Sequence, residues 1–181
     1  MKKFLIVLCC FACIFSLLCF SACEASVEQT TEAVADNGEE NAQVNIILSS
    51  DVTEVAAGEE FIITGTVKKS ELFAAGDLTF SFDKKQMTAE FVEENEQGMY
   101  SFSNETGSGY QYSAYVASTV NLENAMLFTV YCVADESCKS GDEIEITLSC
   151  DEWLVGTDEK GDDVNSIASS VATNSLLIKV K

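Results

Sequence analysis

The sequence predicts an all-β protein: a single jelly-roll β-sandwich of about nine antiparallel strands, preceded by a signal peptide and a disordered linker. Short runs of alternating apolar and polar residues recur from Val44 to Lys181. Most glycines of this range fall between the runs, as expected at turns. The 138 residues from position 44 onward are enough to bury one hydrophobic core. These observations indicate one domain over residues 44–181.

The first 22 residues have the pattern of an export signal. Lysines at positions 2 and 3 precede an apolar run of 15 residues, Phe4 to Leu18, whereas a membrane-spanning helix needs about 20. Phe20-Ser21-Ala22-Cys23 follows and resembles the bacterial lipobox, with Phe20 in place of the usual Leu. We therefore expect residues 1–22 to be removed and Cys23 to be lipid-anchored at the extracellular face of the cell membrane. Cleavage after Ala25, which would release a secreted protein, is the alternative.

The charge distribution excludes one large class of partners. The chain has 10 lysines and no arginine, and all 30 acidic residues follow position 23, so removal of residues 1–22 leaves a net charge of −22. This balance excludes nucleic acid as a partner and repels anionic lipid headgroups, so membrane attachment must come from the lipid. Residues 23–43 include six acidic residues and no aromatic one, which predicts a disordered, extended tether.

Cysteine and histidine usage argues against a metal site. Beyond Cys23, the chain after the signal keeps Cys132, Cys138 and Cys150, so at most one intramolecular disulfide can form among these three, and its pairing stays open. There is no histidine, and no Cys-x-x-Cys pair follows the signal. We therefore expect neither a metal nor a cofactor. Cys150 continues an apolar alternation and is expected to be a small buried side chain.

Nine runs are expected as strands. The alternation is clearest where Leu78, Phe80 and Phe82 interleave with polar residues, and it recurs at Ile144 to Leu148. A helix over 159–171 is a weaker expectation. The expected strands are Val44–Leu48, Glu60–Val67, Leu78–Phe82, Thr88–Val92, Met99–Ser103, Tyr110–Val116, Ala125–Val133, Glu143–Cys150 and Ser175–Val180.

Five segments carry a family resemblance. They are Val55 to Ile63, Ala74 to Asp83 with the run Phe80-Ser81-Phe82-Asp83, Met87 to Val92, Gly141 to Leu148, and the closing strand Leu176 to Val180. In this order they resemble the cohesin domain, with which cellulosomal scaffold and cell-surface proteins capture dockerin-bearing enzymes. The resemblance covers nearly all of residues 44–181. The family's usual Pro after the Asp is Lys84 here, and its other frequent prolines are missing, which leaves room for a partner other than a dockerin.

The resemblance implies a nine-stranded jelly roll in which the third, fifth, sixth and eighth strands form a flat protein-binding sheet. The expected partner is a dockerin-bearing protein linked to polysaccharide degradation, and Asp77 falls where the family often has a dockerin-contacting polar residue. A merely solvated sheet face would present similar polar residues. From alternation, the candidate contact residues are Ala75, Asp77, Thr79 and Ser81 on the third strand, Thr129 and Tyr131 on the sixth, and Glu145, Thr147 and Ser149 on the eighth.

Direct carbohydrate binding is the alternative function. The cohesin fold is shared with carbohydrate-binding modules that stack sugars on coplanar aromatic side chains. The candidate rings are Tyr110, Tyr112, Tyr115 and Trp153. Tyr110 and Tyr112 share a face of their expected strand while Tyr115 points to the opposite face, so packing of these rings in or beside the core is the favoured interpretation.

Catalysis is not expected. Paired carboxylates suitable for glycoside hydrolysis exist at Glu93-Glu94, Asp151-Glu152 and Asp162-Asp163, but 30 acidic residues produce such pairs by chance. There is no histidine to act as a base and no Gly-x-Ser-x-Gly motif. The segment Asp158 to Asp163 resembles a calcium loop only superficially, since it lacks the alternating ligand spacing, and is expected to be a solvated acidic turn.

Overall fold

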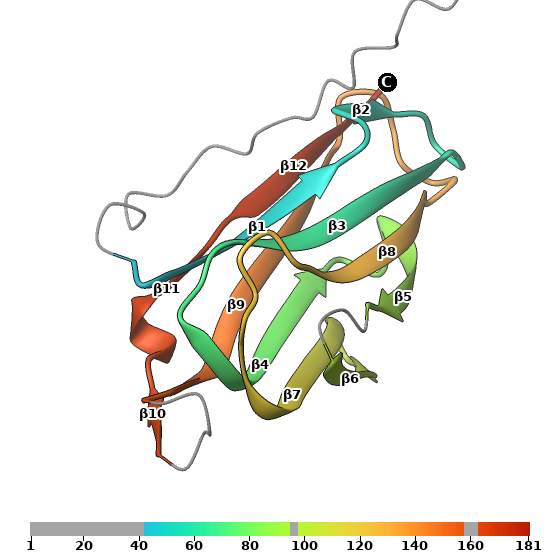
Figure 1. Ribbon diagram of the computed structural model, residues 1–181. Helices are drawn as coiled ribbons and strands as arrows, with labels where there is room; N and C mark the ends of the chain where they lie inside the picture. Colours follow the sequence, from blue (N-terminus) through green and yellow to red (C-terminus); the bar gives the residue numbers. More distant parts are fainter. Residues whose placement is uncertain (1–41, 95–97, 158–162) are drawn as a thin grey trace, which may run out of the picture.

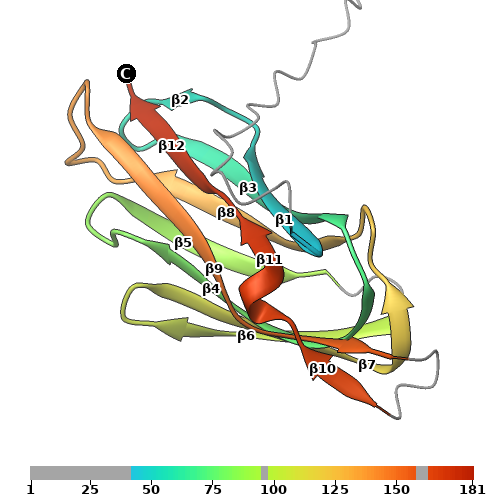
Figure 2. The same cartoon turned by 90° about the vertical axis from the view of Figure 1, so that its left-hand side faces the viewer.

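The computed structural model describes residues 42–94, 98–157 and 163–181, which form two packed β-sheets (Figures 1 and 2). The five-stranded sheet has the order β11-β1-β3-β8-β5, and the seven-stranded sheet has the order β2-β12-β9-β4-β7-β6 with β10 paired to β9. The strands are β1 (Val44–Ser50), β2 (Glu54–Val55), β3 (Glu60–Lys69), β4 (Leu72–Phe82), β5 (Met87–Glu93), β6 (Met99–Thr106), β7 (Gly109–Asn121), β8 (Met126–Ala134), β9 (Glu143–Gly156), β10 (Val164–Ser166), β11 (Val171–Thr173) and β12 (Ser175–Val180).

The two sheets make a β-sandwich closed in the jelly-roll manner, which confirms the predicted fold class. Strands β1 and β11 pair in parallel at one side, as do β2 and β12, while every other pairing is antiparallel (Figure 2). All nine expected strands are present. The prediction missed three short strands, β2, β10 and β11, which are only two or three residues long and have too few residues to show an alternation.

The core lies between the sheets because each strand turns its apolar residues inward. From the five-stranded sheet come fully buried Leu48, Ile63 and Val130, and from the seven-stranded sheet come Leu78 and Ile146. Full burial of one such side chain stabilises the fold by roughly 1.5–3 kcal/mol relative to exposure. The alternation in the sequence therefore reports which face of each strand is inside.

Aromatic rings join the two sheets at the centre of the core. Phe80 of β4 packs edge-on against Phe91 of β5 and Phe128 of β8, with ring centroids 6.0 and 6.1 Å apart. Gly65 of β3 leaves room for one of these rings, since a Cβ there would lie 2.3 Å from Phe128 Cζ. Gly76 was expected at a turn, but it lies inside β4, where a Cβ would lie 2.8 Å from the ring of Trp153. Both glycines are required by close packing rather than by a turn.

Asn174 connects the sheets where the chain passes from β11 to β12. Its side chain is buried, accepts a hydrogen bond from Leu48 N at 2.6 Å through Oδ1, and donates one to Leu48 O at 3.0 Å through Nδ2. One amide thus satisfies both backbone groups of a residue in β1, which lies in the five-stranded sheet with β11, whereas the following strand β12 belongs to the seven-stranded sheet.

A β-bulge in β9 lets Cys150 and Trp153 both face the core. Opposite β4, Leu78 pairs with Cys150 but Asp77 pairs with Glu152, so Asp151 is the extra residue. As a result Asp151 and Glu152 are both exposed, whereas Trp153 is buried. The bulge explains why two consecutive acidic side chains of β9 both face solvent, although side chains normally alternate between the two faces of a strand.

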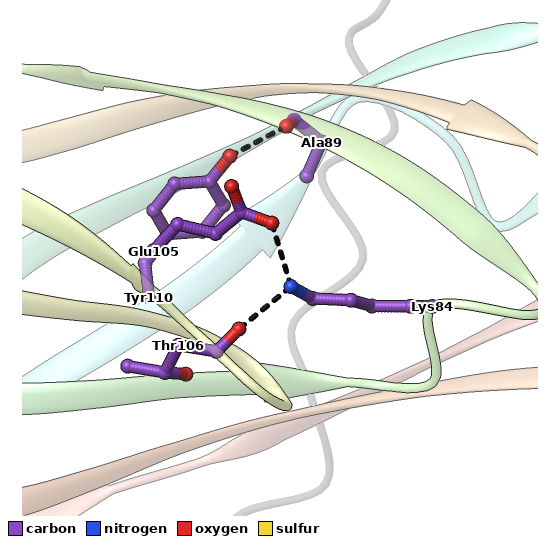
Figure 3. A network of polar contacts seen from close by, with 5 residues as sticks. All are labelled: Lys84, Ala89, Glu105, Thr106 and Tyr110. Atoms are coloured by element: carbon purple, nitrogen blue, oxygen red, sulfur yellow. Dashed lines mark hydrogen bonds and ion pairs between the residues drawn. The ribbon is translucent and has the colours of Figure 1, made fainter.

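Lys84 connects the β4–β5 turn to the β6–β7 hairpin. Its Nζ lies 2.6 Å from Glu105 Oε1 and donates to the carbonyl of Thr106 at 2.6 Å (Figure 3). Nearby, the hydroxyl of Tyr110 donates to the carbonyl of Ala89 in β5 at 2.8 Å (Figure 3). Lys84 thus links the β4–β5 turn to β6, and Tyr110 links β7 to β5, on the side of the sandwich where the edge strands β5 and β6 lie.

The remaining expectations have mixed outcomes. The helix over 159–171 is wrong for the described residues 163–171, which form β10, a short 3₁₀ turn at Ala168–Ser170 and the start of β11. Residues 1–22, residues 23–41 of the tether expected at 23–43, and the acidic turn at 158–162 lie outside the described residues, and those expectations stay predictions. The last two tether residues are ordered and not disordered as expected, because Ala42 is buried and Gln43 N donates to Ser170 O at 2.9 Å. Among the described residues, Cys132, Cys138 and Cys150 are free thiols, and no helix is long and apolar enough to span a membrane.

Candidate partner-binding face

The outer face of the seven-stranded sheet contains most of the residues predicted to contact a partner. Along β4, Leu78, Phe80 and Phe82 are buried and their neighbours are partly exposed, so the alternation predicted for Ala75, Asp77, Thr79 and Ser81 is confirmed. On the adjacent strand β9, Glu145, Thr147 and Ser149 are exposed. The register places Thr79 opposite Ser149 and Ser81 opposite Thr147, so these residues share one face.

Thr129 and Tyr131 do not belong to this face. They lie on β8, between β3 and β5 in the five-stranded sheet, and therefore on the other side of the sandwich. Ala125–Val133 is the seventh of the nine expected strands, so its assignment to the sixth was wrong. Thr129 is also buried, and its hydroxyl donates to Glu94 at 3.2 Å. The strand that actually lies beside β4 is β7, formed by the run predicted as Tyr110–Val116.

Strands β6 and β7 add an exposed aromatic patch, formed by Tyr100, Phe102 and Tyr115. Their exposed fractions are 59%, 49% and 51%. Tyr100 pairs with Tyr115 across the strands, and their rings stack with centroids 5.5 Å apart. Alternation alone missed Tyr100 and Phe102 because β6 turns Ser101 and Ser103 inward, which is the reverse of the usual pattern. Aromatic side chains that are exposed together are typical of protein-binding surfaces.

Beside the aromatic patch lies an acidic group, formed by Asp77, Asp151 and Glu152. Asp77 pairs with Ser113 of β7 on one side and Glu152 of β9 on the other, and Ser113 in turn pairs with Phe102. Asp151 is held in place by Thr79, whose hydroxyl donates to Oδ2 at 2.5 Å. Within the described residues the only ion pair is Lys84 with Glu105, so no described lysine neutralises the acidic group.

The negative charge of the acidic group acts on the thiol of Cys150, which precedes Asp151 in β9 and faces the core. Burial raises the pKa of the thiol to about 12, and the charges of Asp151, Asp77 and Glu152 act in the same direction. Cys150 is partly buried and packs against the core, as predicted. Negative charge thus accumulates at one end of the face, and the aromatic patch lies next to it.

The four rings proposed for sugar stacking do not form a binding strip. Tyr112 and Trp153 are each only 1% exposed, and Tyr110 turns inward to donate to Ala89 in the other sheet. Burial raises the pKa of Tyr112, as expected for a ring in the core. Tyr115 alone points outward, with Tyr100 and Phe102 as its exposed neighbours.

Both carboxylates of the candidate catalytic pair Glu93-Glu94 are engaged in structural contacts. Although burial raises the pKa of Glu93, hydrogen bonds, chiefly from the Ser103 hydroxyl at 2.5 Å, hold it below its usual value. Glu94 accepts the hydrogen bond from Thr129. The described residues contain no group of three or more His, Cys, Asp or Glu side chains arranged to hold a metal ion.

Comparison with solved structures gives cohesin modules as neighbours. A non-cellulosomal cohesin of the archaeon Archaeoglobus fulgidus is 16% identical with a TM-score of 0.59, covering 77% of this chain and 92% of its own. The third ScaC cohesin of Acetivibrio cellulolyticus, solved with the ScaB dockerin, is 18% identical with a TM-score of 0.56, covering 76% and 97%. The cohesin module of a Clostridium perfringens family 33 glycoside hydrolase is 14% identical with a TM-score of 0.56, covering 77% and 98%.

No family model matches the sequence, and no curated protein is significantly similar to it in sequence. The likeness is therefore one of architecture: the same two-sheet jelly roll with little sequence in common. The cohesin modules align over more than nine-tenths of their own length, so the similarity covers the whole domain rather than a shared motif. This chain has the fold of cohesin modules.

Proposed function

We propose that this protein is a binding module, and not an enzyme, that captures a dockerin-bearing protein on the outer face of its seven-stranded sheet. The observation that carries the proposal is the combination of the aromatic patch and the acidic group on the outer face of one sheet. Several structural neighbours were solved in complex with dockerins, which supports this class of partner.

The surface indicates what a partner must bring. Tyr100, Phe102 and Tyr115 offer apolar area on rigid strands, so little conformational entropy is lost when a partner covers them. The unneutralised carboxylates of the acidic group favour Lys or Arg beside that apolar contact. An amphipathic helix with a basic flank meets both requirements.

We further propose that Cys23 anchors the module to the outside of the cell by lipid, with residues 24–43 as the tether. In that arrangement the partner is a secreted enzyme, such as one that degrades polysaccharide, and the module holds it at the cell surface. The acidic tether and domain repel both each other and anionic lipid, which keeps the domain away from the membrane.

Affinity capture tests the proposal. The immobilised protein is incubated with proteins secreted by the source organism, and bound proteins are identified by mass spectrometry. We expect dockerin-bearing proteins to be recovered and to be lost with Asp77→Arg, because the new charge repels the basic flank. Glu123→Arg is the matched control, since Glu123 is exposed in the β7–β8 turn and away from the face. Equal loss with both variants would contradict a site at Asp77.

Direct polysaccharide binding remains the second candidate, because Tyr100, Phe102 and Tyr115 are exposed side by side. Incubation with insoluble cellulose or xylan separates the two functions. Depletion of the protein, reduced by Tyr115→Ala, would favour carbohydrate binding. Dockerin capture without any depletion would exclude it.

A further inference from the structure

The five-stranded sheet has a groove on its outer face that the proposed function does not use. Its volume is about 670 Å³, within the usual size range of ligand sites. Strands β3, β8 and β5 form its floor, where Ile62, Tyr131 and Val133 contribute apolar surface. We call this surface the Tyr131 groove.

Tyr131 of β8 is part of the floor of this groove, with β3 on one side and β5 on the other. The strand register places it directly between Ile62 of β3 and Glu90 of β5. Half of the side chain, 51%, is exposed. An aromatic ring in this position offers a flat, electron-rich face to a ligand above it.

The rim of the groove is acidic. Asp51, Glu60 and Glu90 line it, and no lysine of the described residues does. Asp51 is fixed there by a reciprocal pair of contacts, because Ile62 N donates to Asp51 Oδ1 at 2.8 Å and Asp51 N donates to Ile62 O at 3.1 Å. Within the described ranges none of the three carboxylates forms an ion pair.

We propose that the Tyr131 groove binds a cationic peptide segment of a second partner protein, with a Lys or Arg side chain lying over the ring of Tyr131. The aliphatic part of such a side chain fits the apolar floor, and its charge meets both the ring and the carboxylates. This site is separate from the proposed dockerin face, which lies on the other sheet.

Electrostatic repulsion argues against three other ligands: a second copy of this chain, its own N-terminal segment and an anionic lipid surface. A second copy of this chain carries a net charge of −20, the segment at 24–43 contains six acidic residues, and anionic lipid headgroups are negative as well. Addition of a strand along β5 is also hindered, because the carbonyl of Ala89 already accepts the hydrogen bond from Tyr110. The ligand is therefore expected to lie across the sheet face.

The probe for the experiment is the peptide acetyl-Gly-Lys-Gly-Arg-Gly-amide, titrated into the ¹⁵N-labelled protein at 0.15 M salt and followed by amide chemical shifts. The same peptide with Gln for both basic residues is the control ligand. We expect shifts to centre on β3, β5 and β8 with the basic peptide alone. No binding, or shifts centred on the acidic group of the other face, would overturn the proposal.

Variants distinguish a built site from general attraction to an acidic protein. Tyr131→Ala is expected to weaken peptide binding roughly two- to fivefold, while Tyr131→Phe retains it. Glu60→Gln with Glu90→Gln should weaken it further. The matched control is Glu71→Gln with Glu123→Gln, which removes the same charge from two loops. An equal loss in the control pair, or no loss with Tyr131→Ala in a protein whose spectrum shows it folded, would refute the site.

Discussion

Tyr115 and Tyr131 are exposed to the same extent, 51% each, yet they lie on opposite outer faces of the sandwich. Tyr115 stacks on Tyr100 within an aromatic patch that borders an acidic group. Tyr131 is a single ring among carboxylates in a groove. The first surroundings suit a broad partner surface and the second suit one cationic side chain. Equal exposure therefore does not mean equal function, because the neighbours on adjacent strands decide what a ring can bind.

The first prediction concerns Asn174, whose side chain binds the backbone of β1 at the point where the chain passes from one sheet to the other. Asn174→Ala is expected to lower the free energy of unfolding by about 2–4 kcal/mol, because it leaves Leu48 N and O buried without their partner. Urea unfolding followed by circular dichroism measures the loss. Asn165→Ala, at an exposed position in β10, is the control and should cost under about 0.5 kcal/mol. Similar losses for both would contradict the assigned role.

The second prediction separates the two faces and rests on the proposed function. Tyr115→Ala should weaken capture of a dockerin-bearing partner by about 2 kcal/mol, or roughly 30-fold, because it removes half of the stacked pair at the centre of the patch. Tyr131→Ala is the matched control and should leave that affinity unchanged. Calorimetric titration with the captured partner measures both. Loss of affinity with Tyr131→Ala alone would mean that the partner binds the five-stranded sheet instead.

The fold was predictable because alternation reports burial strand by strand, as at Leu78, Phe80 and Phe82. The candidate site was predictable only in part, because alternation says that a residue points outward but not to which sheet it belongs. That is why Tyr131 was grouped with Asp77 although a whole core separates their sheets. The aromatic patch was missed for another reason: β6 is an edge strand that turns serines inward and aromatic rings outward. Sheet order and strand register supply what the sequence pattern lacks.

The third prediction compares the thiol pKa values of Cys132 in the five-stranded sheet and Cys150 in the seven-stranded sheet. Burial raises the pKa of Cys132 and of Cys150 to about 12, but Asp151, Asp77 and Glu152 contribute only to Cys150, whereas Asp51 contributes to Cys132. Asp151→Asn with Glu152→Gln should therefore lower the pKa of Cys150 and leave that of Cys132 unchanged. Thiol labelling rates at pH 10, resolved by mass spectrometry, are expected to rise for Cys150 alone. A parallel rise at Cys132 would indicate general loosening instead.

The same raised pKa makes stability depend on pH. The thiol of Cys132 has a pKa of about 12 in the folded state and an ordinary value of 9.0. Below pH 9 the thiol is neutral in both the folded and the unfolded chain, and its contribution to stability is fully present. That contribution is lost as the pH rises from 9 towards 12, by up to about 1.4 kcal/mol per pH unit for Cys132, because only the unfolded chain ionises there. Urea unfolding at pH 8 and pH 10.5 should show a smaller decrease for Cys132→Ala than for the unaltered protein. An identical decrease would show that other groups dominate.

The smallest effect on stability is expected at Lys84, on the side of the sandwich where the edge strands β5 and β6 lie. Lys84→Met removes the contacts to Glu105 and Thr106, but both charged side chains are substantially exposed, so stability should fall by only about 0–1 kcal/mol. Lys85→Met is the control, since Lys85 makes no ion pair within the described residues. Hydrogen exchange is the more sensitive measurement: amides near the tip of the β6–β7 hairpin should exchange faster with Lys84→Met alone, and the difference should shrink at high salt. Unchanged exchange there would mean that the hairpin is held by its strand pairing with β4 and not by Lys84. The binding surfaces on the two sheets would then not depend on the contacts of Lys84.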